Sequence, residues 1–341
     1  NNYAYNNPLD GIYADDSASH CIIRNNRANR NVMSGITVSG SDNLVESNEV
    51  WGSIQNHELN CTSGADADGI RFFGTNQTLR YNHIHDIPYQ DPYVIDAHID
   101  CFQTWSDTYH PRAENIILEK NLCDNQVLGP YGDHGTGVMI ANSVNVTIKN
   151  NVFRTYTGVN EGGTGINQGM KIVNNTLVGS LTLSDTYYPM GVVVGSTDDI
   201  IKNNIFYTSR TRALIIRFSG TLKFVMDNNL YYDTPIIGED DDLSIVWEDL
   251  AEWRTASGRE SNSLYADPLF VSSTDYRLQQ FSPAIDAGDD IGYVLDFAGN
   301  TVPAGSAPEI GIYEFMSSSP PLSGDRDFSK SRLGVQLKDK N

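Results

Sequence analysis

Three short segments of the chain combine titratable side chains with an apolar strand pattern. They are Asp68–Phe72, Asp100–Thr104 and Thr136–Ile140, and each places a large apolar residue after Gly69, Cys101 or Gly137. Neighbouring parallel strands lie about 4.8 Å apart, so side chains at equivalent positions of stacked strands touch. The polar residues just before these apolar positions are then expected to form one patch: Asp66 and Asp68, His98 and Asp100, Asp133 and His134.

The chemistry of this patch depends on paired carboxyl groups. Asp68 directly precedes Gly69 and Asp100 directly precedes Cys101, so the two carboxylates hold equivalent positions. Two carboxylates that lie so close to each other share a proton, bind a cation or act as acid and base. We expect both at the surface of the fold, and a solvated acidic edge is the simpler alternative. The candidate catalytic residues are Asp68, Asp100, His98 and His134, and the candidate substrate-binding residues are Arg71, Gln103, Trp105, Tyr93, Tyr131 and Asp133.

A repeat along the chain predicts how these segments are positioned. An apolar residue is followed two or three positions later by asparagine, at Asn26, Asn48, Asn82, Asn121, Asn151, Asn175, Asn204 and Asn229. The spacing runs from 22 to 39 residues, a base period in the low twenties with insertions. A coil of that length fits three short strands and three turns, and stacked coils bury a core that no single coil closes. Asparagine at one turn of each coil tolerates a left-handed backbone and can bond to the next turn.

This ladder resembles the right-handed parallel β-helix proteins, secreted solenoids that mostly handle polysaccharides, over residues 11 to 235. The expected fold class is all-β, with a β-helix at 1–235, a C-terminal cap at 236–316 and a linker or tail at 317–341. The cap resembles the C-terminal segment of many bacterial secreted β-helix proteins and would cover the open end of the solenoid. Residues 247–255 favour a short helix with Leu250 and Trp253 on one face.

Charge and composition limit the classes of molecule that the protein is expected to bind. Lys plus Arg is 23 and Asp plus Glu is 43, so the net charge is −20, which disfavours nucleic acid and anionic membranes. There is no stretch of 18 apolar residues. The chain opens on Asn1 without a signal peptide, as a mature or trimmed chain would, and we expect it to be secreted or on the cell surface. The four cysteines match no zinc motif, and we expect Cys21 and Cys101 to be buried strand residues.

One resemblance points to hydrolysis. Three segments are similar to the motifs of polygalacturonase-type glycoside hydrolases: Asp66-Ala67-Asp68-Gly69, Ile99-Asp100-Cys101 and Asp133-His134-Gly135. The resemblance implies that Asp68 and Asp100 activate water and that His134 supports them. Ile99 stands where that family has its general acid, so His98 or Asp96 would supply the proton.

A second resemblance points to β-elimination. The segment Tyr93–His98 fits the Tyr-x-x-Asp-x-His pattern of one branch of β-helix lyases and uronate epimerases. The calcium-dependent pectate lyases are similar in their Asp-Ala-Asp-Gly ligands, and Asp66, Asp68 and Asp100 would bind Ca²⁺ through oxygen. Met139 stands in the column of the lyase lysine, so His98, His134 or Tyr131 would be the base.

Binding without catalysis is a third hypothesis. The insertions that border the three strands carry aromatic residues suited to stacking on sugar rings, namely Trp51, Trp105, Tyr89, Tyr93 and Tyr109. A structural or adhesive surface protein is a fourth. We favour an enzyme that acts on polysaccharide or oligosaccharide, and hydrolase over lyase, because the net charge of −20 suits a neutral or weakly charged glycan.

Overall fold

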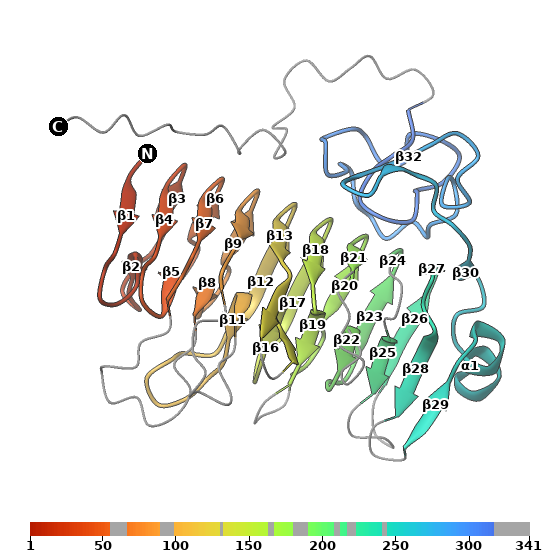
Figure 1. The fold of residues 1–341 in the computed structure, drawn as a ribbon, viewed down its shortest axis with the longest axis horizontal. Helices are drawn as coiled ribbons and strands as arrows, with labels where there is room; N and C mark the ends of the chain where they lie inside the picture. The colour runs from red at the N-terminus through yellow and green to blue at the C-terminus, as the bar shows by residue number, and fades with distance from the viewer. Residues whose placement is uncertain are drawn as a thin grey trace.

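The computed structural model is a right-handed parallel β-helix (Figure 1). It describes residues 1–54, 67–88, 99–129, 132–162, 167–179, 190–207, 212–216, 223–240 and 244–316. Strand numbers increase by three along the first parts of each long sheet, because each coil gives one strand to each of three sheets. The predicted fold class is confirmed, and the 8-stranded third sheet agrees with about eight complete coils.

Three long sheets form the sides of the solenoid. Sheet A contains β1 (Tyr3–Tyr5), β4 (Arg27–Asn29), β7 (Glu49–Trp51), β10 (His83–His85), β13 (Leu122–Asn125), β18 (Val152–Thr155), β21 (Thr176–Val178), β24 (Ile205–Tyr207), β27 (Leu230–Tyr232) and β30 (Leu264–Tyr265). Sheet B contains β2 (Ile12–Ala14), β5 (Ser34–Val38), β8 (Asp68–Phe72), β11 (Asp100–Thr104), β16 (Thr136–Ile140), β19 (Thr157–Glu161), β22 (Met190–Val194), β25 (Arg212–Ile216), β28 (Ile236–Asp240) and the antiparallel β29 (Ile245–Trp247). Sheet C contains β3 (Ile22–Arg24), β6 (Leu44–Glu46), β9 (Thr78–Arg80), β12 (Glu114–Glu119), β17 (Val144–Lys149), β20 (Lys171–Val173), β23 (Asp199–Lys202) and β26 (Phe224–Asp227).

Two small antiparallel hairpins complete the strands: β14 (Val127–Gly129) with β15 (Gly132–His134), and β31 (Phe270–Ser272) with β32 (Asp275–Leu278). The one helix of the described residues is α1 (Leu250–Ser257). It begins after Asp249, whose side chain accepts from the Glu252 N–H, and ends at Gly258 in the left-handed conformation. No helix in the described part of the chain is long and apolar enough to span a membrane.

The predicted asparagine ladder is buried between sheets C and A. The Oδ1 of Asn151 accepts from the backbone N–H and from the side chain of Asn121, at 2.9 and 3.0 Å, and Asn151 bonds to Asn175 in the same way. The side chain of Asn151 also donates to the carbonyl of Leu118 at 3.0 Å. The left-handed residue is the one before each ladder asparagine, such as Lys120 at φ 56°, and not the ladder asparagine as the sequence predicted.

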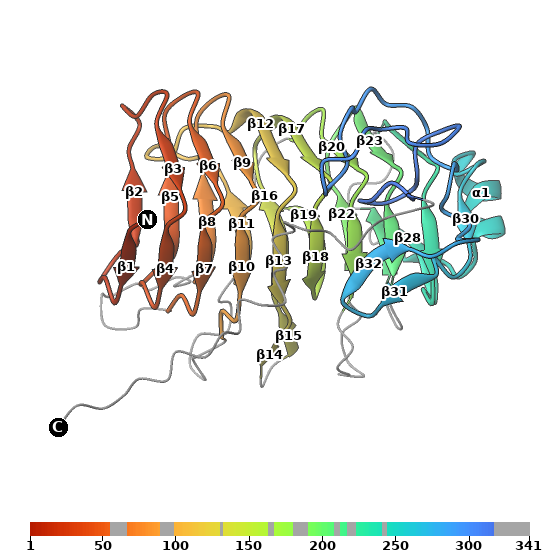
Figure 2. The same ribbon diagram turned by 90° about the horizontal axis from the view of Figure 1, so that it is seen from above.

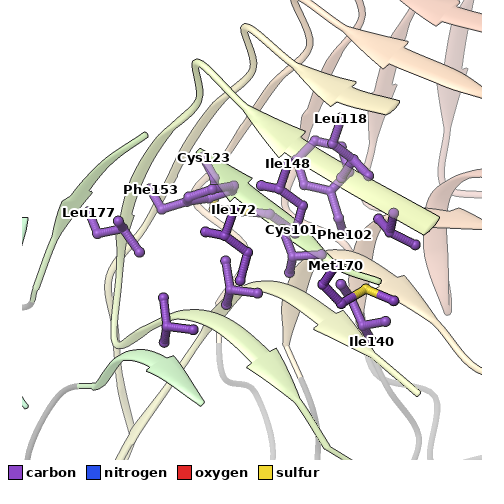
Figure 3. Close-up of a cluster of buried hydrophobic side chains, with 14 of the residues drawn as sticks. Cys101, Phe102, Leu118, Cys123, Ile140, Ile148, Phe153, Met170, Ile172 and Leu177 are labelled. Carbon is purple, nitrogen blue, oxygen red and sulfur yellow. A yellow bond between two sulfur atoms is a disulfide. The ribbon is translucent and has the colours of Figure 1, made fainter. Parts of the chain in front are cut away.

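Glycine recurs at the second position of the strands of sheet B, as Gly69 and Gly137 do, and we call these stacked positions the glycine column. A Cβ on Gly69 would lie 2.6 Å from Ile84, and one on Gly137 would lie 2.5 Å from Phe153, because a large side chain of sheet A fills that space in each coil. Cys101 occupies the same column and forms a disulfide with Cys123 of β13. Both cysteines lie in the core cluster of Figure 3.

The two predictions about cysteine had different outcomes. Cys101 is buried, as expected, but Cys21 is exposed and lies outside the strands. Cys21 comes directly before β3, where its backbone N–H donates to Asn43. The disulfide was not predicted, because the sequence does not reveal that β11 and β13 face one another across the core.

The end of the solenoid is covered by α1. Leu250 and Trp253 belong to the same buried cluster as the solenoid core, so the predicted helix and its apolar face are confirmed. β28 still pairs in parallel with β25, so the solenoid continues past the predicted boundary at residue 235. Residues 266–316 do not cover the end: they pack on the outer face of sheet A, where Phe270 and Ile310 contact the outward side chains of β18 to β27 (Figures 1 and 2).

Asparagines one position before the ladder hold this C-terminal segment. The side chain of Asn150 donates to the carbonyl of Leu295, and that of Asn174 donates to the carbonyls of Glu309 and Gly311. Asn203 and Asn228 donate to the carbonyls of Asp289 and Ala287. In the Asn-Asn pairs of the later coils, the second asparagine therefore bonds to the next coil inside the turn, and the first holds the C-terminal segment outside it.

The ladder generates the first prediction. Asn151→Ala removes the acceptor of the Asn121 amide and the donor to Leu118 in a buried turn. Each buried group left unsatisfied costs about 1–3 kcal/mol, so we expect the free energy of unfolding to fall by about 2–4 kcal/mol in a denaturant titration. Asn29→Ala, in the outward part of β4, is the control and should change it by less than about 0.5 kcal/mol. Equal effects of the two substitutions would show that the ladder contributes nothing specific.

Candidate functional site on sheet B

The three predicted strands are present with the predicted bounds, as β8, β11 and β16. Phe102 pairs with Ile70 and with Val138, and Gln103 pairs with Arg71 and with Met139. Asp68 and Asp100 therefore hold equivalent places on adjacent strands, as the alignment predicted. The backbone N–H of Asp100 donates to Asp68 Oδ1 at 3.1 Å.

Asp68 is held by an arginine three residues later. Arg71 Nε donates to Asp68 Oδ2 at 2.7 Å, and both side chains are almost fully buried. Arg71 points outward from sheet B because its neighbours Ile70 and Phe72 lie in the core, and Asp68 is on the same side because it bonds to Arg71. Removing one partner of a buried ion pair leaves an uncompensated charge, so this pair constrains both residues.

Asp100 repeats this arrangement with a neutral partner. Gln103 Nε2 donates to Asp100 Oδ2 at 3.1 Å. Two coils before Asp100, Ser34 and Thr37 of β5 hydrogen-bond to each other at 2.9 Å in the equivalent positions. The outer face of sheet B thus carries a row of polar pairs, of which two contain a carboxylate.

The expected exposure of the two aspartates is wrong. Asp68 is 0% exposed and Asp100 is 2% exposed. Both lie on the outer side of the sheet, but each is bonded to a partner side chain that is itself buried. Substitutions at these positions will therefore affect stability as well as any function.

An aromatic cluster lies beside the carboxylates. The guanidinium of Arg71 lies over the ring of Trp105, 5.2 Å from its centroid. Trp105 also packs edge-on against Phe73, with centroids 4.9 Å apart, and its Nε1 donates to Asp107 at 3.0 Å. His110 contacts both rings and the Asp107 carboxylate. The cluster fixes the guanidinium between a carboxylate and an aromatic ring.

Phe73, Asp107 and His110 were not among the candidate residues. Phe73 directly follows β8, so its position next to the polar row could be deduced from the strand. Asp107 and His110 come from the 106–114 insertion, and only the folded loop brings them to Trp105. Burial opposes ionisation of Asp107, but hydrogen bonds from Tyr109, Trp105 and His110 outweigh it and lower the pKa of Asp107 to about 2.

Several predicted site residues lie outside the described residues or away from this face. Asp66, Tyr89, Tyr93, His98 and Tyr131 are outside the described residues. Asp133 and His134 lie in β15, whose backbone pairs with Leu128 and Val127 of the hairpin. Trp51 belongs to sheet A, so it cannot share a groove with Trp105. Tyr109 is 83% exposed near the cluster.

The donor set at Asp68 does not favour the predicted Ca²⁺. Calcium takes six to eight oxygen ligands, whereas Asp68 Oδ2 accepts from a guanidinium and Oδ1 accepts from a backbone N–H. The positive charge of Arg71 beside this carboxylate repels a cation. Asp66, the third predicted ligand, lies outside the described residues.

A second carboxyl pair is buried inside the solenoid. Glu161 of β19 pairs in register with the core residue Ile140 and lies against Asp199 of β23. Burial, and then the charge of Asp199, raises the pKa of Glu161 well above its usual range. Burial also raises the pKa of Asp199, against hydrogen bonds from Ser196 and the Met170 N–H. Burial and the neighbouring carboxyl group therefore favour the protonated form of Glu161.

This pair generates the second prediction. The folded-state pKa of Glu161 exceeds the unfolded value of about 4.3, so its contribution to stability is present at low pH and is lost as pH rises through the folded-state pKa. Glu161→Gln cannot ionise and can still donate to Asp199. We expect the variant to gain stability relative to the original chain as pH is raised from 5 to 9 in denaturant titrations. Glu119→Gln, on sheet C, controls for loss of one charge; parallel pH profiles for Glu161→Gln and the original chain would contradict the prediction.

Comparisons with known proteins found similarity at the level of solved structures. No protein-family model and no curated protein matches the sequence. Among solved structures, the chain is similar to the tailspike protein of the E. coli bacteriophage HK620 in complex with a pentasaccharide, at 11% identity and a TM-score of 0.49. That match covers 65% of this chain and 39% of the tailspike, so the chain spans about two fifths of the tailspike's length. It is also similar to the surface protein and adhesin PfbA of Streptococcus pneumoniae, at 11% identity and a TM-score of 0.40, over 70% of this chain and 77% of the adhesin.

Proposed function

We propose that this protein degrades a polysaccharide by hydrolysis and binds the sugar on the outer face of sheet B, over β8 and β11. The observation that carries the proposal is the pair of carboxylates at equivalent places on adjacent strands, each bonded to a side chain three residues later. Two carboxyl groups close together are what glycoside hydrolysis needs. The net charge of −20 favours a neutral or weakly charged glycan over a polyanion.

The two aspartates would have different roles. Asp68 is bonded at both oxygens, to Arg71 and to the Asp100 N–H, so it suits a fixed negative charge that stabilises an oxocarbenium-like sugar. Asp100, with a neutral amide as its partner, is the better base for activating water. The proton for the leaving group would come from His98 or Asp96, and His134 would support the pair.

Substrate contacts would come from the same row. Arg71 and Gln103 are multiple donors suited to sugar hydroxyls, and Trp105 offers an apolar ring for stacking. The disulfide between Cys101 and Cys123 supports a secreted or cell-surface location, because disulfides persist in oxidising compartments.

Glycan binding without cleavage is the second candidate. It is favoured by the burial of both aspartates, at 0% and 2% exposed, and by the protein hydrogen bonds that each already accepts. A reacting carboxylate must reach the glycosidic oxygen or a water molecule. A binding module needs only that the row stays rigid and presents donors.

The third prediction separates these candidates. On a panel of plant, algal and bacterial polysaccharides, we expect new reducing ends without the absorbance of unsaturated uronates near 235 nm (roughly). Asp100→Asn should lower turnover by at least about a hundredfold, the scale of general acid–base help. Asp68→Asn should do the same and also lower the free energy of unfolding by about 3 kcal/mol, because it breaks the buried pair with Arg71.

Asp42→Asn, an exposed turn residue next to sheet C, is the matched control and should leave activity and stability unchanged. Absorbance near 235 nm (roughly) would instead indicate a lyase. Retention on a glycan gel without new reducing ends would indicate a binding module. Full activity in Asp100→Asn on a substrate that the original chain cleaves would remove sheet B from the mechanism.

A further inference from the structure

A different group of side chains gathers on the outer face of sheet A. One ligand atom from each of Glu49, His83 and His85 lies within 4.8 Å of the other two. In the part of the chain that the structure describes, this is the one group of three or more such residues. It is on another sheet from Asp68 and Asp100, and the function proposed above does not use it.

The alternation of side chains along β10 and the register between β7 and β10 bring these three residues together. His83 and His85 flank Ile84 on β10, and Ile84 is fully buried in the core, so both imidazoles point outward. Their ring centroids are 4.3 Å apart. Glu49 of β7 pairs in register with His83, which brings its carboxylate beside both rings. All three side chains are largely buried, with His83 at 9% exposed.

The surroundings of His85 orient one nitrogen toward the group. Its Nδ1 lies 2.8 Å from Asp86 Oδ2, so this nitrogen carries a hydrogen, and in the neutral imidazole Nε2 carries the lone pair. Nε2 is buried, has no hydrogen-bond partner and lies 3.5 Å from Glu49 Oε1, longer than a normal hydrogen bond. The ring of Trp51 is parallel to that of His85 at 4° and 5.8 Å, which fixes the plane of the imidazole.

Glu49 is oriented in a similar way. Arg27 Nε donates to Glu49 Oε2 at 2.8 Å, so Oε1 is the oxygen that faces the two histidines. The guanidinium is mostly exposed, and solvent therefore screens its charge. The group thus combines two imidazoles and one carboxylate oxygen, with a second carboxylate behind one imidazole.

We propose that Glu49, His83 and His85 bind a divalent transition-metal ion such as Zn²⁺. Two imidazole nitrogens and one carboxylate oxygen are a donor set for zinc and related ions, whereas Ca²⁺ takes oxygen ligands. Three protein ligands leave a fourth position for water, and the partial exposure of Glu49 and His85 lets water reach it. Asp86 is a positioning residue, since a carboxylate that accepts from the other ring nitrogen orients a metal-binding histidine.

The test is calorimetric titration of the full chain, dialysed against EDTA, with Zn²⁺ and separately with Ca²⁺. We expect one Zn²⁺ per chain and no comparable Ca²⁺ binding. Glu49→Gln and His85→Gln should each weaken zinc binding at least tenfold, and Asp86→Asn should weaken it about 10- to 100-fold. His20→Asn, an exposed histidine between β2 of sheet B and β3 of sheet C, is the control and should bind zinc as the original chain does.

Two further measurements distinguish a loss of zinc binding from misfolding of a variant. Circular dichroism checks that each variant keeps its strands, and Zn²⁺ should raise the melting temperature of the original chain but not that of Glu49→Gln. Co²⁺ should give a visible absorption band in the original chain that Glu49→Gln loses. Zinc affinity unchanged in both Glu49→Gln and His85→Gln, or no zinc binding by the original chain, would overturn the proposal and leave His85 as an ordinary ion-pair partner of Glu49 and Asp86. None of these outcomes depends on activity toward polysaccharide.

Discussion

The structure depends on stacking each coil on the next with the same register. Backbone groups pair between coils along three sheets, and the buried asparagine ladder extends this pairing through the turn between sheets C and A. A turn inside a solenoid would otherwise bury amides without partners, which is costly. Because the ladder asparagine satisfies its neighbour in the next coil, the loops inserted elsewhere can vary in length without shifting the strands.

Because the register between coils is constant, a pattern that repeats in the sequence becomes a column of stacked side chains in the structure. The glycine column of sheet B exists because a large side chain of sheet A occupies the space of a Cβ in each coil. In one coil the pair of glycine and large apolar residue is replaced by Cys101 and Cys123, and the disulfide fills the same volume. The same rule puts Asp68 beside Asp100 and Glu49 beside His83, so the candidate glycan face and the candidate metal site share one geometric origin.

The three outer faces of the solenoid carry different polar groups. Sheet B carries the buried pair of Asp68 and Arg71 under an aromatic cluster, and sheet A carries His83 and His85 near its N-terminal end. Farther along sheet A, residues 266–316 cover the outer face and are held by Asn150, Asn174, Asn203 and Asn228. Among the described residues, this segment packs on the later strands of sheet A, from β18 to β27, whereas the histidines lie on the earlier strand β10.

The sequence alone determined the local and periodic features. The asparagine period predicted the β-helix, and the apolar pattern predicted β8, β11 and β16 and the equivalence of Asp68 and Asp100, because stacking repeats with the chain. The short helix and its buried face were also predicted, since Leu250 and Trp253 are three residues apart. These features need only a residue and its neighbours in sequence or in the next coil.

Tertiary structure decided what depends on contact between different sides of the coil. Asp68 and Asp100 are buried although they lie on the outer side of sheet B, and the disulfide depends on β11 facing β13 across the core. The histidine group was missed because His83 and Glu49 are far apart in the sequence and meet only through strand register. The path of residues 266–316 along the outer face of sheet A, and not over the end, depends on the outward apolar side chains of β18 to β27. Such contacts join positions whose separation along the chain follows no period, so a repeat cannot encode them.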